Sequence, residues 1–248
     1  MKSEVVYGLH AIAAVLKNRR QAILELYVLQ GRHDRRLQDL IRKAKGLALI
    51  NKSRIELNKI AGSEQHQGIV ALMESGVSNT SNMLPEAEIS NFLKNLSRPA
   101  LVLIIDGVTD PQNFGACLRS ADAAGVDLVV TPKDKSVGLT PVVRKVACGA
   151  AEVVRLCQVT NLARAMETLQ KSGVWIYGAA GEADKSVFEM HLNGSVAIAV
   201  GAEDTGLRRL TREKCDHLMH IPMSGSVSSL NVSVATGVCL FEAVRQRN

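Results

Sequence analysis

The segment IPMSGSVSSLNVSVATGVC, from Ile221 to Cys239, holds neither a charged residue nor an aromatic ring. Apolar residues recur at three- or four-residue intervals through its second half, which predicts a helix from near Ser229–Asn231 to about Arg245. Another face of this helix carries a stripe of small residues: Ser229, Ser233, Thr236 and Gly237. We expect this stripe to pack closely against another helix or a second subunit, with polar groups at its N-terminal end left for a ligand.

Upstream of this segment, short β-rich runs alternate with helical patterns from Ala100 onward. The runs are ALVLIID, DLVVTP, AEVVRL, VWIYGAA, SVAIAVG and HLMHIPM. Such alternation predicts a mostly parallel sheet covered by helices, and ligands of such sheets bind at the carboxyl ends of the strands. Three segments follow strands in this way: DGVTDPQNFGACLRS, GAEDTG and MSGSVSSLN, which begin at Asp106, Gly201 and Met223.

Several polar residues in these segments are candidates for a site. Asn113 is expected to cap the helix that follows Asp110-Pro111, and Arg119 lies further along that helix. Glu203 stands between two glycines and is either a turn-forming residue or an acceptor that faces a cleft. Taken singly, Asn113 as a simple cap and Arg119 in a surface salt bridge are the favoured interpretations. The chain has no GxGxxG fingerprint, no P-loop, and no metal-ligand spacing among its six histidines.

The first third of the chain predicts a separate, smaller α/β unit. Helical spacing in YGLHAIAAVLKN is followed by a strand in ILELYVL, an amphipathic helix in DRRLQDLIRKAKG, a strand in LALI, a short helix near Ser53–Ala61 and a strand in GIVALM. A Ser-, Asn- and Gly-rich stretch then leads into a short helix. We therefore expect domains at residues 1–75 and 98–248, joined by a linker at residues 76–97.

The net charge of +6 is concentrated in the first unit, where residues 1–75 hold 13 Lys and Arg against 7 Asp and Glu. A concentrated basic surface predicts a polyanionic partner, most readily a nucleic acid, although an ordinary solvated surface is the open alternative. With 3% aromatic residues a base-stacking platform is not expected, so binding would use phosphates and shape. The candidate RNA-binding residues lie on or beside one helix: Arg32, Arg35, Arg36, Arg42, Lys43 and Lys45.

Cysteine usage and hydropathy indicate the compartment. The five cysteines are scattered, odd in number and without CxxC spacing, which predicts reduced thiols in a cytosol rather than a disulfide framework or a zinc site. The N-terminus is a poor signal peptide, and no apolar run is long enough to span a bilayer. We expect a cytoplasmic protein with no membrane association and no metal.

Taken together and in order, NFGACLRS, GAEDTG and IPMSGSVSSLNVSVATG resemble the three motifs of the SpoU/TrmH family of RNA ribose 2′-O-methyltransferases. YGLHAI and HQGIVA extend the resemblance into the first third of the chain. The resemblance implies a C-terminal SPOUT methyltransferase domain with a deep trefoil knot, and a ribosomal-protein-like RNA-binding N-terminal domain. S-adenosylmethionine (AdoMet) would sit in the knot against backbone groups of Gly201, Ile221 and Leu230.

The same resemblance implies a set of active-site residues: Asn113, Arg119, Glu203, Ser229 and Asn231. It also implies a homodimer joined through the C-terminal domains, and methylation of a guanosine ribose in large-subunit (23S) ribosomal RNA. Because a guanidinium is almost always protonated, we hypothesise that Arg119 pairs with a substrate phosphate and does not act as the base. The alternatives are the same reaction on transfer RNA or a catalytically silent RNA-binding or ribosome-assembly protein. A nicotinamide-dependent oxidoreductase is not favoured, because no strand is followed by the GxGxxG fingerprint of dinucleotide binding.

Overall fold

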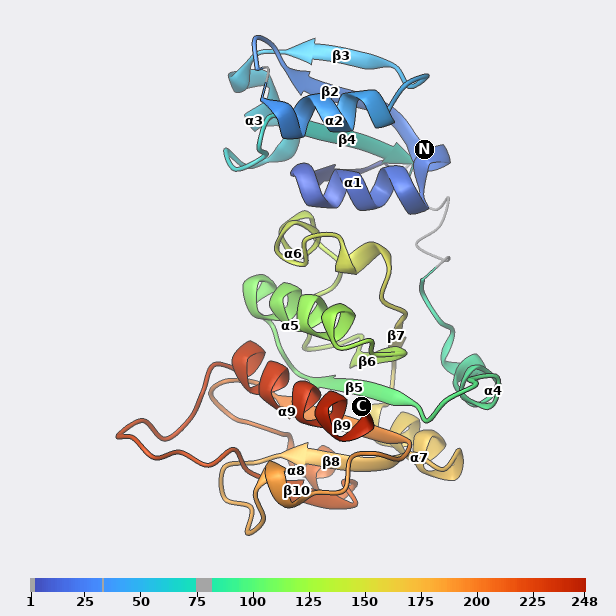
Figure 1. The fold of residues 1–248 in the computed structure, drawn as a ribbon, viewed down its shortest axis with the longest axis vertical. Coiled ribbons are helices and arrows are strands. Elements are labelled where there is room, and N and C mark those ends of the chain that lie inside the picture. Colours follow the sequence, from blue (N-terminus) through green and yellow to red (C-terminus); the bar gives the residue numbers. More distant parts are fainter. Residues whose placement is uncertain (1–2, 33, 75–81) are drawn as a thin grey trace. The chain divides into compact units, whose positions relative to one another are not determined.

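The computed structural model describes residues 3–32, 34–74 and 82–248 (Figure 1). Contacts within the chain divide it into two units. The first comprises Met1–Asn82 together with the later segment Leu139–Val153, and the second comprises Met83–Gly138 and Val154–Asn248. Part of the expected linker at residues 76–97 lies outside the described residues. Its later part contains the short helix α4 (Ile89–Lys94). The expected limits at residues 75 and 98 stay predictions.

The first unit is built on a four-stranded mixed sheet in the order β1-β4-β2-β3. Its strands are β1 (Ser3–Tyr7), β2 (Ile23–Leu29), β3 (Leu49–Lys52) and β4 (Ile69–Glu74). Strand β4 pairs antiparallel with both β1 and β2, while β2 and β3 are parallel. Strands β2, β3 and β4 were expected, whereas β1 was not predicted from its short, partly polar sequence.

Helices cover both faces of this sheet because apolar side chains alternate along its strands. Val6, Leu26 and Ala71 pack in a core with α1 (Leu9–Asn18) and α2 (Arg35–Lys43). Their neighbours in sequence, Tyr7, Tyr27 and Val70, pack in a second core with α3 (Arg54–Ala61). Asp34 caps α2, and Ser53 with Glu56 forms a capping box on α3. The three helices expected in this unit are confirmed.

A buried ion-pair cluster ties Leu139–Val153 into the first unit. The guanidinium of Arg19 pairs with Glu152 at 2.8 Å and with Glu4 at 2.7 Å, and Arg144 pairs with the same two carboxylates. The side chains of Arg19, Arg144 and Glu152 are at most 3% exposed. Because each buried charge has an opposite partner, removing any one of them leaves another uncompensated. The same segment carries α6 (Pro141–Val146).

The second unit is built on a six-stranded sheet in the order β10-β8-β9-β5-β6-β7, in which every pairing is parallel. The strands are β5 (Leu101–Asp106), β6 (Leu128–Pro132), β7 (Leu156–Val159), β8 (Trp175–Ala179), β9 (Val196–Gly201) and β10 (His217–Met219). The central strands β5 and β9 are buried along their whole length, as expected for a parallel sheet covered on both faces. The expected fold class is confirmed.

The helices of the second unit lie against both faces of the sheet. Helices α4 and α7 (Leu162–Lys171) share one core with Val102, Ile104 and Val130. Helix α9 (Val232–Arg247) packs on β9 and on α5 (Pro111–Ala123), and the short α8 (Arg209–Glu213) contacts α7. The predicted C-terminal helix is confirmed, although it begins at Val232 and runs two residues beyond Arg245.

Two local expectations were wrong. The run AEVVRL does not form a strand: Ala150–Glu152 is a 3₁₀ turn, and β7 begins only at Leu156. The chain turns there because Gly149 has φ +99° and Glu152 is held in the ion-pair cluster. Asn113 does not cap α5, because Asp110 accepts the hydrogen bond from the Gln112 backbone N–H and Pro111 occupies the first helical position.

Candidate active site

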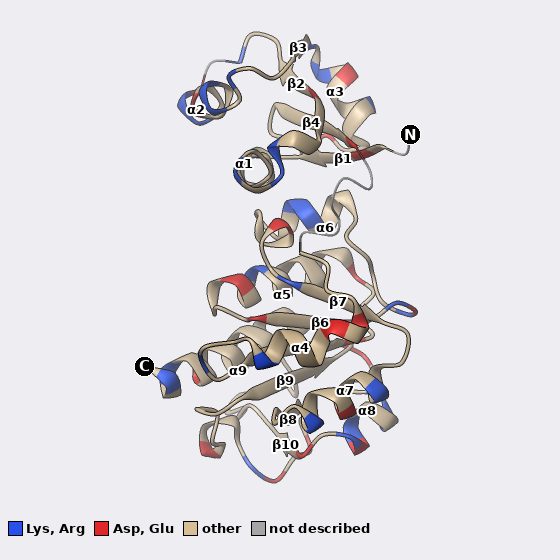
Figure 2. Ribbon diagram, turned by 90° about the vertical axis from the view of Figure 1, so that its right-hand side faces the viewer, with Lys and Arg blue, Asp and Glu red and all other residues tan. Residues whose placement is uncertain are grey.

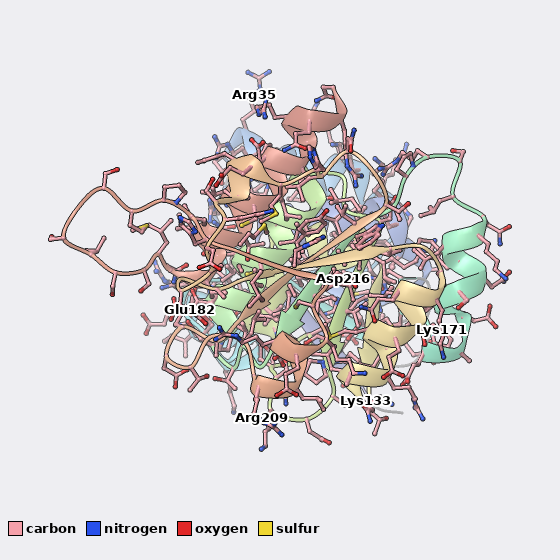
Figure 3. All side chains as sticks on the ribbon, turned by 90° about the horizontal axis from the view of Figure 1, so that it is seen from below. Arg35, Lys133, Lys171, Glu182, Arg209 and Asp216 are labelled. Atoms are coloured by element: carbon pink, nitrogen blue, oxygen red, sulfur yellow. The ribbon has the colours of Figure 1, made fainter. Side chains whose placement is uncertain are left out.

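The three strand-end segments meet at the carboxyl edge of the parallel sheet. Strand β9 lies between β5 and β8, and β10 lies beyond β8. The segments that follow β5, β9 and β10 therefore leave the sheet at the same edge. The loop between β10 and α9 extends away from the sheet, and Figure 3 shows it on the side where Glu182 is labelled.

Asn231 joins all three segments through its side chain. As the N-cap of α9, its Oδ1 accepts hydrogen bonds from the Ser233 backbone N–H at 2.9 Å and from the Ser233 hydroxyl at 2.5 Å. Its Nδ2 donates to Asn113 Oδ1 at 2.9 Å and to Glu203 Oε1. One amide thus caps a helix and holds a carboxylate and a second amide beside each other. Three expected site residues are brought together here.

Asn113 can reach Asn231 because it is not the cap of its own helix. It is the third residue of α5, which begins at Pro111. Since Asp110 accepts from the backbone at the start of the helix, the side chain of Asn113 is available to accept from Asn231. Asn113 was correctly expected near the start of this helix. Its hydrogen-bond partner, however, is the Asn231 side chain and not the backbone of α5.

The GAEDTG loop folds back tightly on the end of β9. A Cβ on Gly201 would lie 2.0 Å from the Gly206 carbonyl carbon, so only glycine fits there. Ala202 and Gly206 exchange two backbone hydrogen bonds, which holds Glu203 at the tip of a short loop. Beyond the loop, the buried carboxylate of Asp106 accepts from the Arg208 backbone N–H at 3.0 Å and from its Nε at 2.6 Å. This anchor was not predicted, although a carboxylate at the end of an apolar strand was visible in the sequence.

A cavity of about 180 Å³, here called the β9 cavity, lies at the ends of β8, β9 and β10. Expected site residues line it: Gly201, Glu203, Ile221, Ser229 and Leu230. All three residues expected to hold a cofactor through their backbones are among them. Ala179, the last residue of β8, and Gly181, which follows the strand, also line this cavity and were missed. The strand-end rule applied to VWIYGAA would have found them.

A second cavity of about 210 Å³, the Asn113 cavity, adjoins the first. It is lined by the loop after β5, including Asp110 and Asn113, and by Ala202 and Glu203. Ala202, Glu203 and Val232 line both cavities. The Asn231–Glu203–Asn113 group therefore stands at the boundary of two adjoining cavities, an arrangement that could hold two reactants beside one another.

Arg119 is the expected site residue that this geometry does not place in the site. It lies six residues beyond Asn113 on α5, its side chain is exposed, and it lines neither cavity. Its assignment as a phosphate partner stays a prediction.

The small-residue stripe on α9 packs against α5. Thr236 is buried, with its hydroxyl 3.4 Å from the sulfur of Cys117, and a Cβ on Gly237 would meet the Ser120 hydroxyl. Burial raises the pKa of the Cys117 thiol to about 11, and the nearby charge of Glu203 also raises it. Cys117 is therefore a packed, protonated thiol and not a nucleophile. Cys157, Cys215 and Cys239, like Cys117, form no disulfide.

Comparison with known proteins identifies the chain. A family model described as the SpoU rRNA Methylase family matches residues 100–241, which include all three strand-end segments. The chain belongs to the SpoU rRNA methylase family. A second model, for RNA 2′-O ribose methyltransferase substrate binding, matches residues 5–75 in the first unit.

Relatives of this SpoU protein match it over nearly the whole chain. The 23S rRNA (guanosine-2′-O-)-methyltransferase RlmB of Shewanella oneidensis is 58% identical over 99% of this chain and 98% of its own length. The crystal structure of an RNA 2′-O ribose methyltransferase superposes with a TM-score of 0.83 at 29% identity, over 99% of this chain and 89% of that one. AviRb of Streptomyces viridochromogenes, solved with its cofactor AdoMet, shares the fold, with a TM-score of 0.78 and 22% identity over 99% and 90% of the two chains.

Within the described residues of this SpoU chain, no helix has the length and apolar character that a membrane span requires. The same residues contain no group of three or more His, Cys, Asp or Glu side chains that could hold a metal ion.

Proposed function

We propose that this protein transfers a methyl group from AdoMet to the 2′-oxygen of a guanosine ribose in 23S ribosomal RNA. The observation that carries the proposal is the Asn231 bridge, which holds Asn113 and Glu203 together at the boundary of the β9 and Asn113 cavities. The substrate is inferred from the Shewanella relative, which has this activity in its name and shares 58% of its residues with this chain.

The β9 cavity has the character that AdoMet requires. Small residues, among them Gly181, Gly201 and Gly206, keep side chains out of it, while Met219 and Leu230 supply apolar walls for a purine ring. Backbone groups of Gly201, Ile221 and Leu230 would hold the cofactor. Bound there, AdoMet supplies a methyl group on a positively charged sulfur. The trefoil knot that this family implies stays a prediction.

Catalysis in this arrangement depends on positioning. Holding two reactants in line can contribute roughly 7–11 kcal/mol to lowering a barrier. Glu203 would accept a hydrogen bond from the ribose and orient it, while Asn231 fixes Glu203 and Ser229 fixes the loop beside the cofactor. Arg119 would pair with a substrate phosphate and lower the pKa of the 2′-hydroxyl electrostatically.

The RNA would also be held by the basic helix of the first unit. Figure 2 shows Lys and Arg along α2. Arg35, Arg36, Lys43 and Lys45 are exposed, which suits contacts with phosphates. Arg42 is paired with Asp39, and Arg32 with Asp34. On binding RNA, each arginine would replace its carboxylate partner with a phosphate.

The enzyme would be a cytoplasmic homodimer joined through the second unit. Val234 and Phe241 lie seven residues apart on α9 and are about half exposed, at 51% and 50%. Residues at this spacing share a helix face, so the helix presents an apolar surface beside the site. Thiols that form no disulfide, such as Cys117, Cys157 and Cys239, suit a reducing compartment.

The test is a methylation assay on RNA from a strain that lacks the gene. Incubation with radiolabelled AdoMet should label 23S rRNA, and nuclease mapping should locate the label on the ribose of one guanosine. Label in transfer RNA alone would favour that substrate instead. Absence of label in every RNA, including that of assembling ribosomal particles, would leave only an RNA-binding role.

A further inference from the structure

A third cavity, of about 270 Å³, lies in the first unit beside the turn that precedes β4. We call it the His66 cavity, since His66, Gln67 and Gly68 line it. Three cationic side chains also line it: Arg32, Arg54 and Lys145. Lys145 comes from Leu139–Val153, the segment that the ion-pair cluster ties to this unit.

His66 builds the wall of this cavity and contributes no charge to it. Its Nδ1 accepts from the Gly68 backbone N–H at 3.0 Å, so its proton is on Nε2, which lies 2.9 Å from Asn58 Oδ1. Burial lowers the pKa of His66, and the charges of Arg54 and Arg32 lower it further. The imidazole therefore stays neutral and rigidly held, and the positive potential in the cavity comes from the surrounding cations.

These cations are not all neutralised by the protein. Arg32 lies over Gly68, so that a Cβ added to Gly68 would come 2.9 Å from the Cδ of Arg32. The Nε of Arg32 pairs with the Asp34 carboxylate at 2.5 Å. Lys145 donates to the neutral Gln65 side chain. Within residues 3–32, 34–74 and 82–248, Arg54 forms no ion pair.

The balance of charge around the cavity is positive. Among the residues that the structure describes, Glu64 is the one carboxylate that lines it, and Asp34 stands behind Arg32. Three cations therefore face two carboxylates, and Arg54 and Lys145 are the two whose charges no ion pair within this part of the chain offsets. An anion that entered the cavity would gain charge-assisted hydrogen bonds from both.

Gln67 adds a neutral donor at the same place. Its Oε1 accepts from the Leu9 backbone N–H at 3.0 Å, at the start of α1. That bond fixes the carboxamide, and no acceptor in the described residues takes a hydrogen bond from its Nε2. Gln67 adopts φ +53°, a left-handed conformation that is unfavourable for a non-glycine residue. The turn thus holds a donor beside the cations at some cost in stability.

We infer that the His66 cavity binds a backbone phosphate of the RNA substrate, with Arg54 and Lys145 pairing with its oxygens and Gln67 donating through Nε2. The inference rests on the proposed function, since it takes RNA as the substrate. It also makes a residue outside the substrate-binding region at 5–75, Lys145, part of RNA recognition.

The test compares two double variants of the full chain. Arg54→Gln with Lys145→Gln removes the two unpaired charges, whereas Lys59→Gln with Lys94→Gln removes two exposed charges that do not line the cavity. Binding of unmodified 23S rRNA is measured by filter binding between 50 and 300 mM KCl. The cavity variant should bind roughly 10- to 100-fold more weakly. Its slope of log affinity against log salt should fall by about 1 to 2. The control should match the wild type.

A charge-retaining variant, thermal melting and ³¹P spectroscopy distinguish a phosphate site for RNA from misfolding and from a site for a free anion. Arg54→Lys with Lys145→Arg keeps both charges and should restore the salt slope. Equal thermal melting of all variants excludes misfolding, and each single variant repeats the test if the double one does not fold. Broadening of the ³¹P signal of inorganic phosphate, lost in the cavity variant while rRNA binding is unchanged, would show a free-anion site and overturn the RNA inference.

The outcome is independent of the methylation assay. A wild-type protein that transfers no methyl group, but whose cavity variant loses salt-dependent rRNA binding, would contradict the proposed function and support the phosphate site. Normal methyl transfer with an unchanged rRNA affinity and salt slope in the cavity variant would overturn the phosphate site alone. Failure of the wild-type protein to bind rRNA would also overturn the inference that the His66 cavity binds an RNA phosphate.

Discussion

At the scale of single residues, the site depends on one asparagine with two separable tasks. The Oδ1 of Asn231 caps α9, and its Nδ2 holds Glu203 and Asn113. Aspartate caps helices about as well as asparagine, but it has no N–H to donate. A change to aspartate therefore removes one task and keeps the other.

We predict that Asn231→Asp lowers kcat/KM for 23S rRNA by about 10²-fold, because the new carboxylate repels Glu203 and misplaces it. The free energy of unfolding should change by less than about 1 kcal/mol, since the cap remains. Steady-state methylation assays and thermal melting measure the two effects. Asn91→Asp, an exposed asparagine of α4 that also donates to a glutamate, is the control and should leave both unchanged. Wild-type turnover by Asn231→Asp would show that the amide bridge has no part in catalysis.

At the scale of elements, the return of the chain onto the end of β9 shapes the β9 cavity. A Cβ added to Gly201 would clash with the backbone of Gly206. A backbone cannot rotate out of the way as a flexible side chain can. A single added methyl group must therefore displace the whole GAEDTG loop.

Gly201→Ala should destabilise the protein by about 1–3 kcal/mol or more and weaken AdoMet binding at least about ten-fold. Thermal melting and isothermal titration with AdoMet measure these changes. Gly194→Ala is the matched control, because no atom lies within 4 Å of its added Cβ. If both variants bind AdoMet equally well, the tight return of this loop does not shape the cofactor site.

The elements also show how far the sequence alone can be read. Strand-end segments and their small residues were visible because a parallel sheet places ligands at one edge, and Gly201, Glu203, Ile221 and Leu230 do line one cavity there. What the pattern could not show were partners far apart in sequence. The cap at Asp110, the anchor between Asp106 and Arg208, and the burial of Glu152 depend on tertiary contacts.

At the scale of the whole molecule, the apolar face of α9 bears on assembly. Val234 and Phe241 stay about half exposed in a single chain, beside a helix pair that is otherwise closely packed. A second copy of the chain would remove this surface from water.

If the proposed homodimer forms through this face, Val234→Lys with Phe241→Lys should yield a monomer of 26.7 kDa, because two charges per chain would otherwise be buried without partners. Sedimentation equilibrium distinguishes the two masses. The control, Ile55→Lys, changes a side chain of α3 that is 81% exposed and should leave the mass unchanged. A double variant that sediments as the wild type does would place any subunit contact elsewhere.

The ion-pair cluster of Glu4, Arg19, Arg144 and Glu152 limits how the protein can be dissected. A fragment that ends at Asn82 would retain Glu4 and Arg19 but lose both partners supplied by the later segment. Arg19 would then keep a single carboxylate, at a site from which water is excluded in the intact chain. Recombination or engineering that exchanges the N-terminal portion at the linker must therefore also exchange residues 139–153. A fragment that ends at the linker does not contain the whole first unit.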